Sequence, residues 1–578
     1  MPMTDALRSN SPAGLAPSPR RAFSSRLVSA AFILVLLGFS LVYLFWLARE
    51  SFMVAGIRYF TLFDDSMISL RYADNLASGH GLVWNPAERV EGITNLGWTL
   101  VMALIRAVGI SRPNTPMAIQ LINLALQIAL LGVVFGYLRR RAGGGVALGA
   151  TIVVALNGPL FSYSLGGFET TLQTLLVTAA LLPLIPTGPE RDQVGRRLFL
   201  VPLWCGLAFL VRPDSGLIFV VGTLGAWWLL RLREARSNGK GSHALLLSII
   251  VGGAIIAGVL VFQKLYYHDW LPNTYHLKAS ADSRGIWRGL KYVARFILRD
   301  WQSGLLVGTI IYLGIGLSAP RTRRYFLPLA LVIASWFGYI VWAGGDVFPL
   351  SRFFIPLVPL LATCAVLSVD WALRQQLPPS SATGAIFRRR LLAGFVFALL
   401  AFQCLCYRQV AWWLDGSLRD CGLSSVLIAR ALTAPGTPLR PADTVGVFYA
   451  GITPYYMPRQ RFHDFLGKCD AHIARSPAKW GPPGHNKWDY DYSLGTVRPA
   501  AIITGATYCG LGQDCSQVAI DKRMCAWVAS KQDYGFIPSL WLDPRFRQDY
   551  QRLLVHYDGQ EPQIQWVYLR RDRLSPHP

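Results

Sequence analysis

The densest group of ionisable side chains in this sequence lies in one short stretch, LFDDSMISLRYADNLASGHGLVWNPAERVEGITN, from Leu62 to Asn95. Its aspartates Asp64 and Asp65 are adjacent, so they cannot share one helical face. One can therefore point at a reacting centre while the other orients or binds the substrate. Two carboxylates beside cations suit glycosyl transfer. One carboxylate takes a proton from an acceptor hydroxyl, and positive charge stabilises a leaving phosphate. The alternative is a capping role at the start of an amphipathic helix, DDSMISLRYADNL.

The rest of the chain is strongly apolar. Of its 578 residues, 53% are hydrophobic and 15% are charged, which is too apolar for an ordinary soluble protein. Lysine and arginine number 56 against 32 acidic residues, so the formal charge is +24. In a soluble protein this excess would suggest nucleic acid, but here the basic residues stand mostly at the ends of apolar runs. We therefore expect the lipid bilayer, and no nucleic acid, as a partner.

The first apolar run predicts a retained transmembrane helix. It extends from Leu27 to Ala48 and is too long for the core of a signal peptide. Arg20, Arg21 and Arg26 precede it, so its N-terminus is expected in the cytoplasm. Residues 1–24 are rich in Ser, Pro and Ala and are expected to form a disordered cytoplasmic tail.

Further apolar runs predict about eleven transmembrane helices, the last from Leu391 to Cys406. The short run Leu96 to Val108 is placed as an interfacial helix on the outer face. His268 to Gln302 is expected to form a long polar loop. With every strongly basic linker inside, residues 25–408 form a multi-pass domain in a bacterial plasma membrane, with an outer first loop over residues 50–115.

The composition changes near the start of the segment 409–578, which is expected to be a separate extracytoplasmic domain. Short runs rich in β-formers, TVGVFYAG and PAAIITG, predict a mixed α/β fold. Several cysteines lie here, and an outer location favours disulfides, such as Cys509 with Cys515 or Cys525, over a metal site.

The first loop resembles that of polytopic glycosyltransferases of the GT-C fold that use lipid phosphosugars, in particular the group that contains the mycobacterial terminal arabinofuranosyltransferases. The residues that carry the resemblance are FDDSMISLRYADNLASGHGLVWNPAERVEGITNLGWTL, LVRPDSG, LPNTYHLK, GGDVFPLSRFFIPLVPLL and DFLGKCDAHIA with GPPGHNK. They extend from the first loop into the C-terminal region, so the resemblance covers most of the chain.

This resemblance implies an enzyme that takes a sugar from a polyprenyl phosphate at the outer leaflet and passes it to an extracytoplasmic glycan or protein. The catalytic aspartate of that fold carries over to Asp64 and Asp65, and the pattern leaves open which of the two acts. It also leaves open whether the anomeric configuration is inverted by a general base or retained through a nucleophile.

Three cations are candidates for binding the donor phosphate: Lys278, Arg352 and Arg71. Arginine is favoured for bidentate contact with a phosphate, whereas interfacial snorkelling is the alternative for Lys278 and Arg352. Arg212 and Asp214, in RPDS, are expected to pair with each other at membrane depth.

Sugar or acceptor contacts are assigned to a second group of residues, for which solvated turns or structural packing are the alternatives. Glu88 and Glu91 could also hold a divalent cation, although no metal site is assigned, and His80 lies between two glycines. Aromatic rings near the GPPGHNK loop suit stacking on sugars. The candidates are His80, Glu88, Glu91, Asp346, His485 and Trp488.

Two other classes of function compete with the enzyme. A secondary transporter would place ionisable groups near the bilayer midplane, and a membrane scaffold would need no carboxylate cluster in its first loop. Within the enzyme class, the transferred sugar could instead be of the mannose or aminoarabinose type. No Walker loop or dinucleotide fingerprint follows a predicted strand, which favours a lipid-linked donor over a nucleotide sugar.

Overall fold

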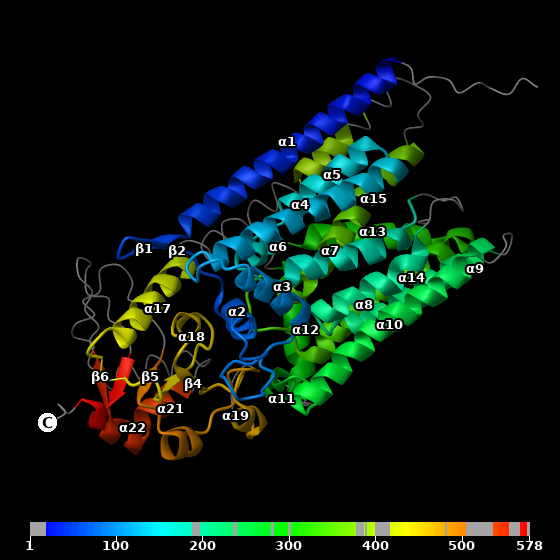
Figure 1. The fold of residues 1–578 in the computed structure, drawn as a ribbon. Helices are drawn as coiled ribbons and strands as arrows, with labels where there is room; N and C mark the ends of the chain where they lie inside the picture. The colour runs from blue at the N-terminus through cyan, green and yellow to red at the C-terminus, as the bar shows by residue number, and fades with distance from the viewer. Residues whose placement is uncertain are drawn as a thin grey trace, which may run out of the picture.

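In the computed structural model, long apolar helices form a bundle, and a smaller mixed α/β unit lies at one end of it (Figure 1). Helices α2 (Asp64–Ala77) and α3 (Leu96–Ala107) lie between the bundle and this unit. The structure describes residues 19–187, 197–234, 240–278, 283–298, 302–376, 387, 390–398, 417–437, 439–479, 483–504, 536–553 and 567–574.

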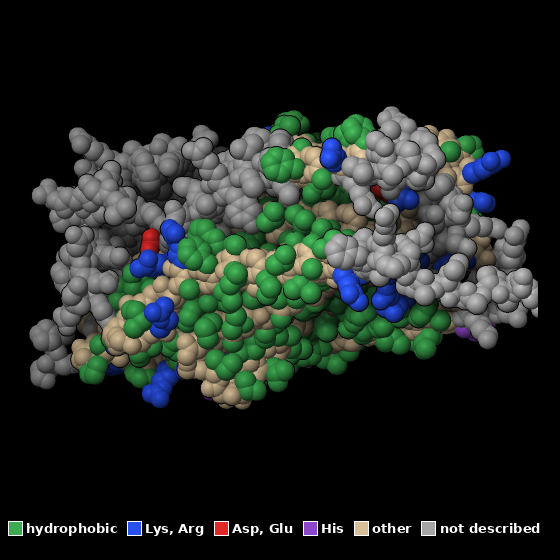
Figure 2. All heavy atoms as spheres, turned by 90° about the horizontal axis from the view of Figure 1, so that it is seen from above, with side chains coloured by type: hydrophobic (Ala, Val, Ile, Leu, Met, Phe, Trp, Pro, Cys, Tyr) green, Lys and Arg blue, Asp and Glu red, His purple; other side chains and the backbone are tan. Residues whose placement is uncertain are grey.

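Six helices of the described residues are long and apolar enough to cross a membrane, and up to eight spans result if each of two bent pairs counts as one. The chain is therefore a multi-pass membrane protein, whereas the count of about eleven is not confirmed. Figure 2 shows a broad apolar face with lysine and arginine side chains toward its two ends. The six helices lie in α1 (Pro19–Arg49), α4 (Thr115–Arg141), α9 (Ser215–Glu234), α10 (Lys240–Tyr267), α14 (Pro320–Ala343) and α15 (Val358–Gln376) with the turn Arg352–Leu357 before it.

The count differs from the prediction because several apolar runs fold as short or broken helices. Helices α7 (Thr170–Leu181) and α8 (Val201–Val211) have 12 and 11 residues, fewer than a straight span needs. A bend of 53° separates α5 (Gly144–Ala155) from α6 (Gly158–Leu165). There the Asn157 side chain accepts a hydrogen bond from the main chain and starts the second helix. The predicted last span lies mostly outside the described residues.

The segment expected to be a long polar loop contains two helices, α11 (Asn273–Lys278) and α12 (Ser283–Leu298), and α13 (Ser303–Ser318) follows. Helix α12 buries Phe296, whose ring stacks on Phe354 at 3.9 Å, while Trp287 on another face stays exposed. The loop prediction was therefore wrong here, because apolar residues at three- and four-residue spacing make SRGIWRGLKYVARFIL an amphipathic helix.

The C-terminal unit is built on a five-stranded mixed sheet, so the predicted mixed α/β fold is confirmed. Strand β3 (Thr444–Val447) pairs in parallel with β4 (Arg461–Asp464) and β5 (Ala501–Ile503). Strand β7 (Val567–Arg570) pairs antiparallel with β5 and with β6 (Tyr550–Leu553). The sequences TVGVFYAG and PAAIITG supply β3 and β5, whereas Cys509, Cys515 and Cys525 lie outside the described residues.

Short helices and one hairpin complete the C-terminal unit and its junction with the bundle. The hairpin, which follows α1 directly, contacts α17. These elements are β1 (Phe52–Val54), β2 (Ile57–Tyr59), α17 (Ser417–Thr433), α18 (Ile452–Tyr456), α19 (Ala471–Arg475), the π-helical turn Asp491–Val497, α21 (Phe536–Leu542) and α22 (Pro544–Asp549).

Candidate active site

Helix α2 begins with the two aspartates and is held firmly at that position. Met67 and Leu70 are completely buried on its inner face. Farther along the helix, Asp74 forms ion pairs with Arg106 of α3 at 2.7 Å and with Arg112 at 2.8 Å. These contacts fix the part of the helix that follows its first turn. The carboxylates of the first turn therefore have defined positions.

Asp64 is held through one of its two carboxylate oxygens. Its Oδ1 accepts hydrogen bonds from the main-chain nitrogens of Gly451 at 3.1 Å and Ile452 at 2.9 Å, at the start of α18. Its Oδ2 is buried and has no hydrogen-bond partner among the described residues. Burial raises the pKa of Asp64 to about 6, although the charge of Lys468 and the two main-chain donors oppose that rise.

Asp65 pairs with a lysine of the C-terminal unit. The distance between its Oδ1 and Nζ of Lys468 is 2.6 Å, and the Lys468 side chain is 12% exposed. Burial alone would raise the pKa of Asp65, but the charges of Lys468, Lys278 and Arg352 lower it to about 2. Asp65 is therefore ionised at any physiological pH, and three cations from three separate segments act on it.

Arg352, one of these three cations, is buried. It binds Oδ2 of Asp346 through Nε at 2.8 Å and Nη2 at 2.6 Å. Its guanidinium also lies over the rings of Phe168 and Phe348, at 5.3 and 4.5 Å. Paired with a carboxylate and packed between rings, Arg352 keeps a fixed orientation, which favours a specific contact over snorkelling.

Two further predicted residues lie close to the same charges. Lys278, at the end of α11, is exposed, and its side chain lies next to Gly484 of the GPPGHNK loop. Burial and the charge of Lys468 lower the pKa of His485 to about 4, so its imidazole is neutral near pH 7. We call the group that these interactions bring together the charged cluster; it consists of Asp64, Asp65, Lys278, Asp346, Arg352 and Lys468, with the neutral His485 beside them.

Lys468 was not among the predicted site residues, although it lies in the motif DFLGKCDAHIA. The loop from Asp464 to Asp470 is tightly turned, and Gly467 has a φ of +75°. A side chain at Gly467 would collide with Ile473. In the sequence, the glycine next to this lysine indicates a turn, but it does not indicate that the lysine pairs with Asp65.

Arg71 contacts the first loop and the C-terminal unit, and none of its hydrogen bonds to described residues is with the charged cluster. Its Nε donates to the carbonyl of Trp84 at 2.7 Å and its Nη2 to that of Gln460 at 3.0 Å, and Nη1 donates to the carbonyl of Pro454. The whole residue is 2% exposed. Its three nitrogens thus satisfy main-chain carbonyls that would otherwise be buried without a donor.

The acidic residues of the first loop have separate partners. Glu88 forms an ion pair with Arg461 at the solvent-accessible start of β4. Glu91 is 5% exposed, its Oε1 accepts from Gln263 at 3.0 Å, and its Oε2 has no described partner. Burial raises the pKa of Glu91 to about 7. His80 is exposed in the turn after α2, where the glycines on both sides of it have positive φ.

Trp488 belongs to the core of the C-terminal unit. It is 6% exposed and packs edge to face with Phe536 at 6.2 Å, while Lys479 lies over its ring at 4.6 Å. Near the membrane helices, Arg212 pairs with Asp214 at 2.9 Å, which confirms the expected pair, and also with Glu169 at 2.7 Å. Among the described residues, no group of three or more His, Cys, Asp or Glu side chains is placed to hold a metal ion.

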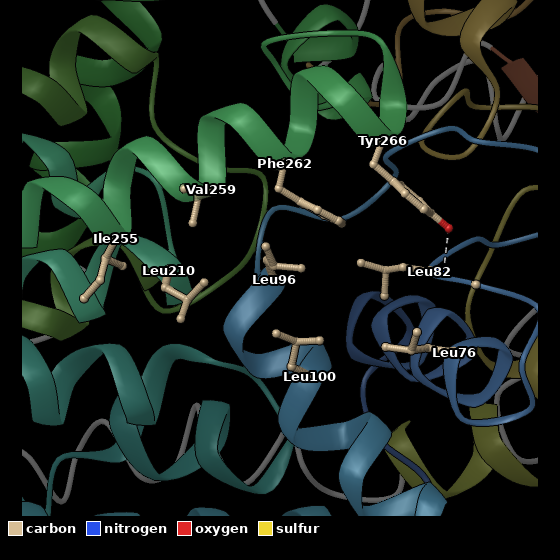
Figure 3. A pocket seen from close by; sticks show the side chains of 11 residues that line it. Leu76, Leu82, Leu96, Leu100, Leu210, Ile255, Val259, Phe262 and Tyr266 are labelled. Atoms are coloured by element: carbon tan, nitrogen blue, oxygen red, sulfur yellow. Dashed lines mark hydrogen bonds between the residues drawn. The ribbon is translucent and has the colours of Figure 1, made fainter.

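An apolar cavity of about 450 Å³ lies near the other end of α2 (Figure 3). Leu76 of α2, Leu100 of α3 and Val259 of α10 face one another across it. Tyr266 borders one side, and its hydroxyl accepts a hydrogen bond from the Leu82 nitrogen at 3.0 Å. The remaining lining residues are Gly81, Leu96, Leu210, Ile255, Gly258 and Phe262.

The fold is the GT-C fold, as the sequence resemblance implied. The chain superposes on ArnT from Cupriavidus metallidurans bound to undecaprenyl phosphate with a TM-score of 0.53, at 13% identity, covering 93% of this chain and 97% of that one. For the oligosaccharyltransferase AglB from Archaeoglobus fulgidus, in complex with an inhibitory peptide and a dolichol-phosphate, the TM-score is 0.50 at 11% identity, with coverage of 82% and 69%.

In sequence, the chain is similar to the terminal beta-(1->2)-arabinofuranosyltransferases. It is 27% identical to that of Mycobacterium tuberculosis over 417 residues, which is 67% of this chain and 60% of the relative. It is 25% identical to that of Corynebacterium glutamicum over 346 residues, 53% of this chain and 48% of the relative. The matches thus span about half to three fifths of these relatives. No family model matches the chain.

Proposed function

We propose that this chain is a membrane-embedded glycosyltransferase that moves arabinofuranose from a polyprenyl-phosphate donor to an extracytoplasmic glycan or protein acceptor. The observation that carries the proposal is the pair Asp64 and Asp65, of which one has an oxygen without a hydrogen-bond partner in the described part of the chain and the other faces three cations. The choice of sugar is supported by the names of the relatives, and the choice of a lipid carrier by the membrane helices and the two GT-C neighbours.

Asp64 is the base in this proposal. A general base works best when its pKa lies near the operating pH, and the pKa of Asp64, at about 6, lies closer to neutrality than that of Asp65, at about 2. Its Oδ1 is held by two main-chain donors, while Oδ2 has no partner among the residues that the structure describes, and an acceptor hydroxyl would supply one. Oδ2 takes the hydroxyl proton as the acceptor oxygen bonds to the sugar.

Lys278, Arg352 and Lys468 bind the donor phosphate. When the bond between the anomeric carbon and the phosphate oxygen breaks, negative charge grows on that oxygen, and positioned cations stabilise it. In this arrangement Asp65 keeps Lys468 in place before the donor arrives, and Asp346 does the same for Arg352. Arg71 supports the first loop and makes no phosphate contact, because it is buried and each of its three nitrogens already donates to a main-chain carbonyl.

The isoprenoid chain of the donor lies in the apolar cavity near Leu76. Leu76 lies eleven positions after Asp65 in α2, which is about 16 Å along the helix at 1.5 Å per residue. A polyprenyl chain is long enough to cover this distance. The cavity is lined by apolar side chains, and Leu100 on its wall is 43% exposed, so a lipid tail would cover surface that is costly to leave in water.

The distribution of arginines supports an extracytoplasmic position for the site and the C-terminal unit. Helix α4 ends in the triplet Arg139, Arg140 and Arg141, and α9 ends with Arg231 and Arg233. Both helices run away from the C-terminal unit, so these arginines gather at the opposite end of the bundle (Figure 1). Excess positive charge marks the cytoplasmic side of a membrane protein, and the C-terminal unit then lies on the other side.

The proposal is tested with the purified full chain in liposomes. It is supplied with polyprenyl-phosphate arabinofuranose, with the corresponding mannose or aminoarabinose donors, or with a nucleotide sugar, together with an arabinan oligosaccharide as acceptor. Transfer from the arabinofuranose donor, with products identified by mass spectrometry, supports the proposal. Transfer only from another lipid donor would mean that the transferred sugar is not arabinofuranose. Transfer only from the nucleotide sugar would overturn the proposal.

A further inference from the structure

The Asn273 side chain closes the loop that carries Lys468. Its Nδ2 lies 2.9 Å from the carbonyl oxygen of Gly467 and 3.1 Å from those of Lys468 and Asp470. Carbonyl oxygens only accept, so three of them around one atom fix that atom as the amide nitrogen. Asn273 is 4% exposed, and without its amide these main-chain groups would be buried with fewer donors.

Asn273 also ties this loop to two other segments. Its main-chain nitrogen donates to the carbonyl of Glu91 in the first loop at 2.9 Å. Its Oδ1 accepts from Nη1 of Arg475, in α19, at 3.2 Å. One residue therefore joins the first loop, α11 and the C-terminal unit at the point where the charged cluster is assembled.

A second buried side chain, that of Asp464, also stabilises the Lys468 loop. The conformation of the loop therefore depends on two residues that can be changed separately. Oδ1 of Asp464 accepts from the Leu466 nitrogen at 3.0 Å, and Oδ2 accepts from the Cys469 nitrogen at 2.8 Å. These bonds set the internal turn of the loop. Among the described residues, the Asn273 side chain joins that turn to α11 directly, whereas Lys487, whose Nζ donates to the carbonyls of His276 and Ala474 at 2.9 Å, joins α11 to α19 after the turn.

Helix α11 itself carries the other lysine of the charged cluster. Asn273 is its first residue and Lys278 its last, so about 7.5 Å of helix separates them at 1.5 Å per residue. We propose that Asn273 is a positioning residue that sets the spacing between Lys278 and Lys468, and thereby the geometry in which the donor phosphate is bound. This inference rests on the proposed function, and it adds a residue that touches no substrate.

Asn273→Ala tests the inference, with Asn85→Ala as a matched control. Asn85 is likewise buried and joins the first loop to the C-terminal unit, through Nδ2 to the Phe462 carbonyl at 2.8 Å and Oδ1 from the Phe462 nitrogen at 3.1 Å. None of its hydrogen bonds to described residues reaches the Lys468 loop. Asn273→Ala is expected to raise the donor KM about tenfold or more while kcat changes less than about threefold. Asn85→Ala is expected to leave the donor KM unchanged.

A second readout does not depend on activity. The full chain in detergent is treated with a water-soluble amine-reactive reagent, and labelling of Lys468 is quantified by peptide mass spectrometry. Its labelling rate is expected to rise severalfold in Asn273→Ala and to stay at the wild-type value in Asn85→Ala. Equal labelling of Lys468 in Asn273→Ala and wild type would overturn the inference. If labelling of Lys468 differs between the variants as expected but the wild-type chain transfers no sugar, the proposed function is overturned instead.

Discussion

Asp65 and Lys468 are 403 positions apart in the chain, and their side chains meet at 2.6 Å. Asp65 belongs to the first turn of α2, and Lys468 to the loop after β4 of the C-terminal unit. The candidate active site is therefore shared between the first loop and the C-terminal unit. Removing either segment removes one charge of this pair and leaves the other partly buried without its partner, which is costly.

Lys468→Met is expected to weaken donor binding. The variant keeps an unbranched side chain and removes the ammonium, so the phosphate loses one charged contact and the donor KM should rise about tenfold or more. Lys479→Met is the matched control, because Lys479 is an exposed lysine of the same unit whose ammonium lies over the ring of Trp488. Steady-state kinetics at varied donor concentration measures both, and an equal KM for the two variants would contradict the phosphate contact.

Activity is expected to fall on the acid side with an apparent pKa near 6. Asp64 must be ionised to accept a proton, and its raised pKa of about 6 means that it is increasingly protonated below that pH. The value of kcat/KM should then drop about tenfold for each pH unit below about 5.5. Initial rates between about pH 4.5 and 8 measure this limb, and a profile that stays flat to about pH 4.5 would exclude Asp64 as the base.

Filling the apolar cavity is expected to discriminate between donors by the length of their lipid. Val259→Trp places a large ring in the cavity, so the KM for a long-chain polyprenyl donor should rise severalfold while a two-isoprene donor is used as well as before. Leu104→Trp, on the 66% exposed position of α3, adds the same ring outside the cavity and serves as the control. If Val259→Trp affected both donors equally, the isoprenoid chain would have to bind elsewhere.

Glu91→Gln is expected to stabilise the protein at alkaline pH. The folded-state pKa of Glu91, about 7, lies above its ordinary value of 4.5, so folding favours the protonated form and stability falls as pH rises between these two values. Glutamine keeps the oxygen that accepts from Gln263 and removes this dependence. The gain should be about 1 to 3 kcal/mol near pH 8 and small near pH 4.5. Thermal unfolding at the two pH values measures it, and an equal effect at both would contradict the assigned cause.

The sequence was sufficient to single out the two acids as candidates and to predict the mixed α/β unit, because both depend on local signals. Adjacent carboxylates after a first apolar run, and β-rich runs such as the one that becomes β3, can be recognised within short windows. Lys468 could not be placed beside Asp65 in this way, since no local pattern records a contact across 403 positions. Arg71 illustrates the reverse case, because a basic residue near the acids looks like a phosphate ligand until its three carbonyl partners are known.

The number of membrane spans was the property that the sequence predicted least well. Runs such as Thr170 to Ile185 are apolar enough to suggest a span, but the helix α7 within this run has only 12 residues. Hydropathy reports whether a segment avoids water and does not distinguish lipid from a protein interior. Packing inside the bundle satisfies the same apolar pattern as lipid contact does.

Asp64→Asn tests the central claim most directly. The amide has the same shape and keeps an oxygen for the Gly451 and Ile452 nitrogens, but it cannot take a proton. We expect transfer from polyprenyl-phosphate arabinofuranose to fall by about 10²- to 10⁴-fold, with binding of the donor unchanged. Transfer within tenfold of the wild type, or a loss of kcat confined to Asp65→Asn, would contradict the assignment of Asp64 as the base.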